Sequence, residues 1–148
     1  MKKVVFLIAI VAYASICIAQ ESTDKDMVRS ACLNYLEGFY QGDAEKIKAC
    51  MKPSLHKLGY WKDSELGTYS EPIHMSHQGA IDYANDVKDN QKFPDDAAPM
   101  EVDVLDVMNH IAAAKVTAWW GYDYILLSKE GDKWMIEQVL WEGPLNNR

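Results

Sequence analysis

The sequence predicts an α+β domain in which about three helices pack on one face of a curved antiparallel sheet. In much of residues 24–90, apolar residues recur at the spacing of a helix. In residues 100–141 they alternate with polar residues, and short segments suited to turns separate the runs. Helices followed by a run of strands are typical of α+β domains.

The first helix is expected from Asp24 to Gln41, with Asp24 available as its N-cap. Gly42 suits the end of this helix, and Asp43 suits the N-cap of a second helix over residues 44–51 that Pro53 stops. The two helices therefore form a tight pair. The apolar face of the first helix consists of Val28, Ala31, Cys32, Tyr35, Leu36, Phe39 and Tyr40.

The middle of the chain is less regular. Residues 54–74 are mixed, with "LGYW" as a candidate short strand and "KDSELGTYSEP" as a polar loop. Ser76 can cap a third helix that runs to about Asn90, with Pro94 beyond its end. The segments "MEVDVLDVMNH", "IAAAKVTAWW", "YDYILLSK" and "KWMIEQVLW" then alternate as successive strands.

The last two strands form a hairpin whose two-residue turn is Gly131-Asp132. This turn places Glu130 opposite Lys133 and determines which residues share a face. One face is expected to hold Asp123, Ile125, Leu127, Trp134, Ile136, Gln138 and Leu140. The other face is expected to hold Tyr122, Tyr124, Leu126, Met135, Glu137, Val139 and Trp141.

Neither face of this hairpin is polar, although an antiparallel sheet often has one side in water. The helices can cover only one face, so the other is expected to meet a partner subunit or to enclose a ligand. The sequence therefore predicts a homodimer whose interface contains Met135, Glu137, Val139 and Trp141. For Glu137, an ion pair in the interface and an edge position in water both stay open.

The first residues match a secretory signal peptide, because Lys2 and Lys3 precede an apolar run from Val4 to Ile18. We expect cleavage after Ala19, which leaves residues 20–148 as a single domain, exported to the periplasm or secreted. The run is shorter than the ~20 residues that cross a bilayer, so no membrane association is expected after cleavage. The net charge of −7 becomes more negative when the two lysines are removed, which argues against nucleic acid as a partner.

Two cysteines, Cys32 and Cys50, remain after cleavage of the signal peptide. Export would place them where a disulfide can form and persist. Both also fall on the apolar side of a predicted helix, a position that suits buried thiols. A disulfide between Cys32 and Cys50 and a pair of buried thiols therefore stay open as alternatives.

The order of elements and three segments resemble the nuclear transport factor 2-like family, specifically its branch named "putative lumazine-binding". The segments are "YLEGFYQGDAEKIKACMKPSL", "HMS" and "DYILLSKEGDKWMIEQVLWE", and the resemblance spans nearly all of residues 20–148. It implies a cone-shaped, strongly bent sheet around a pocket that the first and third helices line, with dimerisation through the outer sheet face. Relatives commonly have His-Pro where this chain has Lys52-Pro53, so any role of that histidine is absent unless His56 substitutes for it.

Asp123 is the sharpest candidate for chemistry, because aspartate is disfavoured in strands and this one shares a face with Ile125 and Leu127. A carboxylate enclosed by apolar groups could act as a general base or acid. The alternative is a structural aspartate hydrogen-bonded to the backbone, to Tyr35 or to Tyr40. The expected ligand pocket suits a small flat heterocycle, and it consists of Tyr35, Phe39, Tyr40, Trp61, Trp119 and Asp123.

No cofactor and no metal site are expected. His74 and His77 could supply half of a metal site near Glu71, but no third ligand is supported, and a solvated helix start explains both histidines. The sequence has no phosphate-binding loop, serine elbow or CxxC motif. The first hypothesis is therefore a non-catalytic exported domain that binds a small flat molecule. The alternatives are an acid/base enzyme of the isomerase, dehydratase or cyclase kind that uses Asp123, and a structural dimerisation module.

Overall fold

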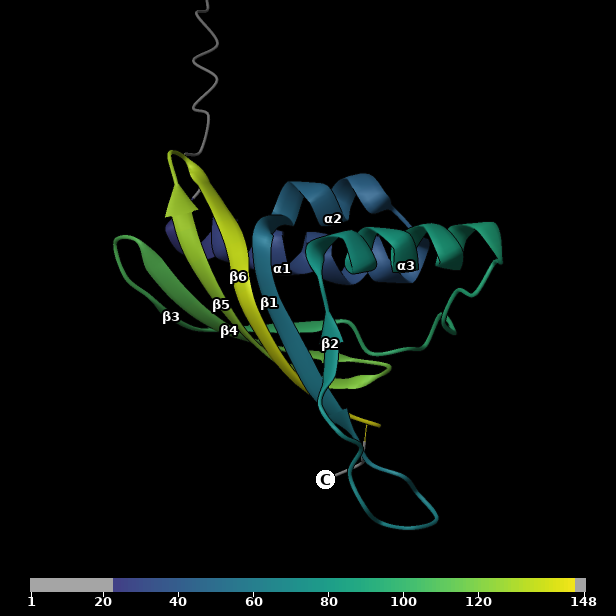
Figure 1. Ribbon diagram of the computed structural model, residues 1–148. Coiled ribbons are helices and arrows are strands. Elements are labelled where there is room, and N and C mark those ends of the chain that lie inside the picture. Colours follow the sequence, from purple (N-terminus) through teal and green to yellow (C-terminus); the bar gives the residue numbers. More distant parts are fainter. Residues whose placement is uncertain (1–22, 146–148) are drawn as a thin grey trace, which may run out of the picture.

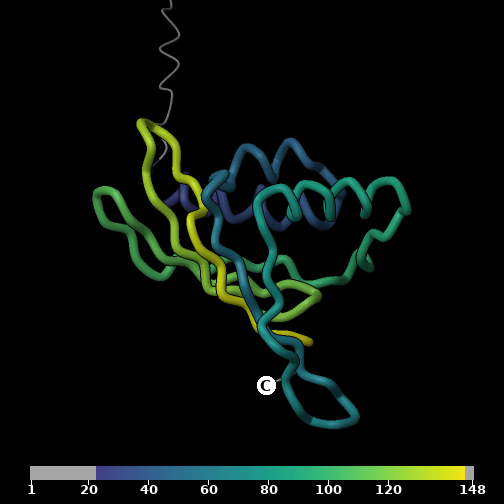
Figure 2. Tube along the Cα trace, in the orientation of Figure 1, coloured from purple at the N-terminus to yellow at the C-terminus, as the bar shows by residue number. Residues whose placement is uncertain are grey.

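The computed structural model describes residues 23–145, which form three helices and one six-stranded sheet. The sheet is strongly bent, and the helices lie together on its concave side (Figures 1 and 2), so the predicted α+β fold is confirmed. The predicted signal peptide, residues 1–19, lies outside the described range. The strands follow the order β2-β1-β6-β5-β4-β3 across the sheet. In chain order the elements are α1 (Asp24–Gln41), α2 (Ala44–Cys50), β1 (Met51–Trp61), β2 (Ile73–Met75), α3 (His77–Asp89), β3 (Glu101–Val107), β4 (Ile111–Ala118), β5 (Gly121–Glu130) and β6 (Lys133–Gly143).

Local sequence signals explain where the helices begin and end. Thr23, and not Asp24, is the N-cap of α1: its side chain accepts a hydrogen bond from the Asp26 N–H, and the Asp26 carboxylate accepts one from the Thr23 N–H. Gly42 ends α1 with a φ of 67°, in the left-handed region. The second and third helices begin at the caps that the sequence predicts. Among residues 23–145, no helix has both the length and the apolar character to cross a membrane.

The strand β1 departs from the prediction, because it begins at Met51 directly after α2 and runs for 11 residues. Pro53 therefore lies within a strand and does not stop the helix. β1 pairs with β6 in parallel, whereas the other four pairings of the sheet are antiparallel. In the described residues, β2 reaches only the Lys57–Gly59 part of β1, so Pro53 lies on an edge where a missing backbone N–H is tolerated.

The β5–β6 hairpin has the predicted turn, and Glu130 faces Lys133 as expected. The register then shifts where β5 passes from Leu127 to Leu126, because β6 has one unpaired residue, Glu137. Such a β-bulge moves every later residue of the strand to the opposite face of the sheet.

The bulge corrects the predicted faces of β6. Val139 is fully buried in the core and Trp141 faces Asp123, so both lie on the concave side and not on the outer face. Gln138 and Leu140, which were expected beside Asp123, are exposed on the outer face. The four residues of the predicted dimer interface therefore do not share one surface.

Cys32 and Cys50 are both buried free thiols, so the alternative of a disulfide between these two described residues is excluded in this structure. Burial raises the pKa of each thiol to about 12. The Cys50 thiol donates a hydrogen bond to the Ile47 carbonyl oxygen at 3.6 Å. The two cysteines act as small apolar side chains of the core.

The buried thiols predict a loss of stability at alkaline pH. Their pKa rises from 9.0 to about 12 on folding, so their stabilising contribution is complete below pH 9.0 and is lost as the pH rises towards 12. The loss amounts to about 1.4 kcal/mol per pH unit for each thiol. Urea unfolding at about pH 8 and about pH 10.5 measures this loss. Between these two pH values, the free energy of unfolding should fall more for the wild type than for the C32A/C50A variant. Equal falls in the two proteins would contradict the prediction.

Candidate functional site

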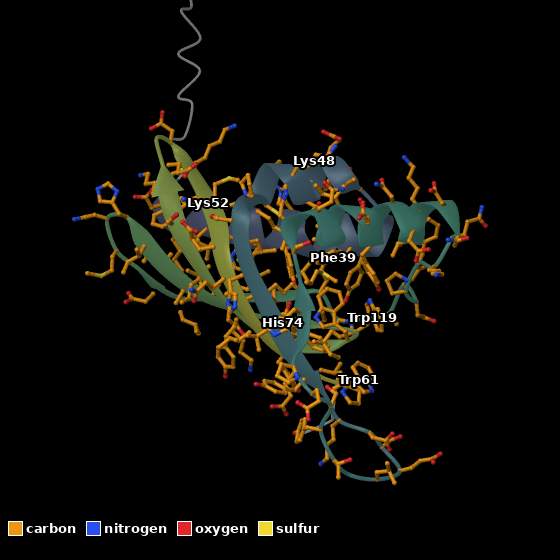
Figure 3. The ribbon with its side chains drawn as sticks, in the orientation of Figure 1. Phe39, Lys48, Lys52, Trp61, His74 and Trp119 are labelled. Atoms are coloured by element: carbon orange, nitrogen blue, oxygen red, sulfur yellow. The ribbon has the colours of Figure 1, made fainter. Side chains whose placement is uncertain are left out.

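A pocket of about 190 Å³ opens between the helices and one end of the sheet. Phe39 of α1, Trp61 of β1 and Trp119 of the β4–β5 turn line it, and they lie near β2 in Figure 3. Most of its wall is aromatic, which is typical of sites that bind flat rings. The lining residues are Phe39, Lys57, Trp61, Ile73, Met75, Tyr83, Trp119, Trp120 and Trp141.

Two glycines make room for tryptophan rings in this wall. A Cβ atom on Gly59 would lie 2.2 Å from Cδ2 of Trp141, so the Trp141 ring packs directly against the backbone of β1. A Cβ atom on Gly143 would likewise lie 2.9 Å from the ring of Trp61. The pocket wall therefore depends on the absence of side chains at these two positions.

Trp120 connects the pocket to the core. Its ring contacts the rings of Tyr35, Phe39 and Tyr40 edge-to-face, with centroid distances of 6.1, 5.8 and 5.9 Å. Its indole Nε1 donates a hydrogen bond to Oδ1 of Asp123 at 2.8 Å. Trp120 thus contacts the pocket with its ring and the buried carboxylate with its N–H.

Lys57 lies at the base of the pocket and is only 6% exposed. Its Nζ donates a hydrogen bond to the Tyr35 hydroxyl at 2.7 Å, and that hydroxyl donates to Oδ2 of Asp123 at 2.5 Å. The distance from Nζ to the same carboxylate oxygen is 3.9 Å. Lys57, Tyr35 and Asp123 therefore form a buried chain that places a positive charge at the pocket and its counter-charge behind it.

Burial has different consequences for the two ionisable groups beside Asp123. Burial first, and then the Asp123 charge, raise the pKa of the Tyr35 hydroxyl well above its usual value, so Tyr35 keeps its proton. Burial lowers the pKa of the Lys57 amine, while the Asp123 carboxylate acts to raise it. The amine lies 5.3, 5.9 and 5.6 Å from the ring centroids of Tyr35, Phe39 and Trp141, within the range of cation–π attraction.

The sequence-predicted pocket residues are only partly brought together. Phe39, Trp61 and Trp119 line the pocket, whereas Tyr35 and Asp123 lie behind Lys57 and are fully buried. Asp123 makes the hydrogen bond with Tyr35 that the structural alternative expected. Its carboxylate is not among the groups that line the pocket.

Tyr40, the remaining predicted residue, also lies outside the pocket lining. Its hydroxyl donates a hydrogen bond to the Pro99 carbonyl oxygen and accepts one from the backbone N–H of Trp119 at 3.0 Å. Tyr40 therefore holds the β4–β5 turn and the segment before β3 against α1. Its contribution to the site is to position Trp119.

The sequence did not predict Lys57, the charged group at the base of the pocket. Lys57 lies on β1, a strand of which the sequence indicated only the last part, and Trp141 lies beyond the β6 bulge. A signal for Lys57 was present, because Lys57, Gly59 and Trp61 alternate at strand spacing in "HKLGYW". The other missed lining residues are Ile73, Met75, Tyr83 and Trp120.

The histidines lie elsewhere. The rings of His56 and His74 are 6.3 Å apart on the outer face of β1 and β2, and His77 begins α3. Across residues 23–145 no group of three His, Cys, Asp or Glu side chains could hold a metal ion.

Glu137 has partners within its own chain. Its carboxylate accepts a hydrogen bond from Ser128 at 2.5 Å and pairs with Lys52 at 2.6 Å. Lys52 also pairs with Glu130 at 2.6 Å, so this lysine connects β1 to both strands of the β5–β6 hairpin. Of the two alternatives that the sequence left open for Glu137, an ion pair between subunits and an edge position in water, neither included this ion pair inside the domain.

One family of known proteins matches this chain over nearly all of its described residues. The family model described as "Putative lumazine-binding" matches residues 23–142. No match is found among curated proteins. An NTF2-like protein of unknown function from Methylobacillus flagellatus is 19% identical, with a TM-score of 0.61 over 83% of this chain and 94% of that chain.

Two further solved structures show the same fold. An NTF2-like protein of unknown function from Silicibacter pomeroyi is 14% identical, with a TM-score of 0.60 over 78% of this chain and 91% of that chain. Another from Shewanella baltica is 18% identical, with a TM-score of 0.57 over 81% and 95% of the two chains. At these identities the likeness shows the fold alone.

Proposed function

The chain belongs to the NTF2-like family described as "Putative lumazine-binding", and on that premise we propose that it binds a small, flat, partly apolar heterocycle in the aromatic pocket. The observation that carries the proposal is the combination of aromatic walls with one buried amine, Lys57, at the base. Aromatic walls hold a flat ring through apolar and edge-to-face contacts. The amine provides a polar contact that fixes its orientation.

Lys57 has the donors that such a ligand requires. An ammonium group carries three N–H donors, and the Tyr35 hydroxyl accepts one of them. A ring carbonyl or ring nitrogen, as lumazine has, could accept another. A hydrogen bond from a charged donor contributes about 1.5–3 kcal/mol. The small volume of about 190 Å³ favours one bicyclic ring over a larger ligand, since typical pockets for drug-sized molecules have about 300–1,000 Å³.

The place of Asp123 supports binding over the acid/base alternative. One carboxylate oxygen accepts a hydrogen bond from Tyr35 and the other accepts one from Trp120, and the side chain has no exposed surface. A general base must come within hydrogen-bond reach of the proton that it removes. In this proposal the role of Asp123 is to balance the charge of Lys57.

Lumazine and pterin are expected to raise the melting temperature of the protein and to quench its tryptophan fluorescence. A ligand at 100 times its Kd adds about 2.7 kcal/mol of stability. Trp119→Ala should weaken binding by about 1–3 kcal/mol, because it removes one stacking wall. Riboflavin, which is tricyclic and carries a side chain, should bind more weakly than lumazine.

Phe93→Ala is the matched control for this experiment, because Phe93 is an exposed aromatic residue outside the pocket lining. Its affinity for lumazine and pterin should equal that of the wild type. The proposal fails if neither bicyclic compound shifts the melting temperature or quenches fluorescence. It also fails if the Trp119 and Phe93 variants bind equally well.

We propose further that a second copy of the chain covers the outer sheet face. Tyr124, Leu126 and Leu140 are 57%, 49% and 54% exposed there, and Tyr124 faces Leu140 in the sheet. We call these three residues the outer patch. Contiguous apolar surface of this kind is seldom left in water.

Light scattering at micromolar concentration should show a dimer. Leu126→Glu should shift it towards the monomer, because the substitution places a charge in the outer patch. Leu66→Glu is the control, since Leu66 is 76% exposed on the β1–β2 loop and away from the patch. A wild-type monomer would contradict this proposal.

We also propose that the domain lies outside the cytoplasm, either in the periplasm or secreted from the cell. Its support is the pattern of residues 1–19, with two lysines ahead of an apolar run. Sequencing the N-terminus of the protein recovered from an exporting host should give Gln20 as the first residue. Recovery with an intact Met1 would contradict export.

A further inference from the structure

We propose that the Lys57 amine forms a covalent imine with the carbonyl carbon of a flat aromatic aldehyde held in the pocket. This inference rests on the proposed function in one respect, namely that the pocket admits a flat ring. It goes further, because it assigns Lys57 a covalent role and names the chemical class of the ligand.

The position of Lys57 supports this chemistry. Of the described residues that line the pocket, Lys57 is the only one with an aliphatic amine, and its Nζ lies among the rings of Tyr35, Phe39 and Trp141. A ring that packs against the aromatic wall would direct a substituent towards the base of the pocket. An aldehyde on that ring would thus meet Nζ.

The charge balance of the site also suits an iminium ion. Lysine is rarely buried without a partner, and here Asp123 is the counter-charge at 3.9 Å. A protonated imine carries the same single positive charge as the ammonium that it replaces. Exchange of one for the other therefore leaves the buried pair neutral, whereas an anionic ligand would add a charge without a partner.

The Tyr35 hydroxyl provides a route for the protons, because it lies between the amine and the carboxylate. The ammonium first passes a proton through Tyr35 to Asp123, and burial of Lys57, which lowers its pKa, favours this loss. The Nζ lone pair then attacks the carbonyl carbon, a C–N bond forms, and a proton moves from nitrogen to oxygen to give a carbinolamine. The proton on Asp123 returns through Tyr35 to the hydroxyl, the C–O bond breaks, and water leaves. The products are an iminium ion, the Asp123 carboxylate and water.

Reductive trapping tests the proposal on the intact protein. Pterin-6-carboxaldehyde is added with sodium cyanoborohydride, which reduces an iminium ion to a stable secondary amine, and the modified lysine is identified by peptide mass mapping. Lys57 is expected to be labelled at least about 10-fold faster than any exposed lysine, because the pocket holds the aldehyde beside its amine. The corresponding pterin alcohol, which has no electrophilic carbon, should bind without labelling.

Variants separate a reactive amine from a structural one. Lys48→Met, at an exposed lysine of α2, should leave the labelling rate of Lys57 unchanged, and Lys57→Met should abolish the fast labelling. Lys57→Met combined with Asp123→Leu removes both charges and serves if the single variant does not fold. Tyr35→Phe should slow trapping and change its pH dependence, a readout that a merely structural role would not move.

The outcomes distinguish this inference from the proposed function. If the aldehyde quenches tryptophan fluorescence but labels only exposed lysines, the imine is refuted and binding in the pocket stands. Labelling of Lys57 at the same rate as the exposed lysines refutes it as well. If the aldehyde, the alcohol and lumazine all fail to bind and Lys57 is not labelled, both proposals are overturned.

Discussion

Replacing Asp123 with alanine is expected to lower the free energy of unfolding by about 3–5 kcal/mol. The carboxylate has no exposed surface, and alanine would leave the Lys57 ammonium buried without its counter-charge. The hydroxyl of Tyr35 and the indole N–H of Trp120 would also lose their acceptor. Urea unfolding, monitored by tryptophan fluorescence and by circular dichroism, measures the loss.

The matched control removes both charges at once. Asp123→Leu combined with Lys57→Met replaces a buried ion pair by apolar side chains, a change that is often nearly neutral. This double variant should regain at least half of the stability that Asp123→Ala loses, and adding Tyr35→Phe should regain more. A loss below about 1 kcal/mol for Asp123→Ala would contradict a charge pair at this site.

Gly121→Ala is expected to cost about 3 kcal/mol or more. Gly121 has a φ of 144°, which side chains rarely adopt, and a Cβ atom there would lie 2.0 Å from the Glu142 carbonyl oxygen. The residue opens β5 directly after Trp119 and Trp120, so any shift of the backbone also displaces two pocket residues. Thermal unfolding should show the loss of stability, and lumazine affinity should fall with it.

Gly131→Ala provides the comparison, because Gly131 also has a positive φ, 57°, but no atom lies within 4 Å of its Cβ position. Alanine at this position is disfavoured only by the positive φ, which lowers the free energy of unfolding by about 1 kcal/mol. The difference between the two variants measures the steric part. Equal losses would show that the contact with β6 is unimportant.

The sequence predicted the elements whose signals are local. The α1–α2 pair follows from Gly42 and Asp43, and the hairpin turn follows from Gly131-Asp132, because capping and turn preferences act within a few residues. The alternating runs likewise marked β3 to β6. The fold class required no more than these signals, whereas the family resemblance also rested on three longer segments such as "DYILLSKEGDKWMIEQVLWE".

Two parts of the site depend on contacts distant in sequence and were missed. The length of β1 follows from its parallel pairing with β6, which begins more than seventy residues later in the chain. The Glu137 bulge has no marker of its own, because neither glycine nor proline stands near it. One unpaired residue therefore changed the predicted side of Val139 and Trp141, and with it the predicted interface.

The enclosure of Asp123 by apolar groups was expected, but its charged partner, Lys57, was not. Aspartate in an apolar strand is unusual enough to draw attention, and Tyr35 was among its expected partners. Lys57 remained unnoticed, because a lysine in an uncertain segment is usually assigned to the surface. The ion pair becomes visible only when β1 is placed beside β6.

The close approach of Gly59 and Trp141 makes the size of the pocket adjustable at one pair of facing positions. The ring of Trp141 occupies the space that a side chain on Gly59 would need. A smaller residue at position 141 would enlarge the pocket beside Lys57. A larger residue at position 59 would fit only if the side chain at position 141 were smaller. Neither change alters the pairing of the strands. An exchange of volume between two neighbouring strands can thus change the size of this pocket while the strands stay paired.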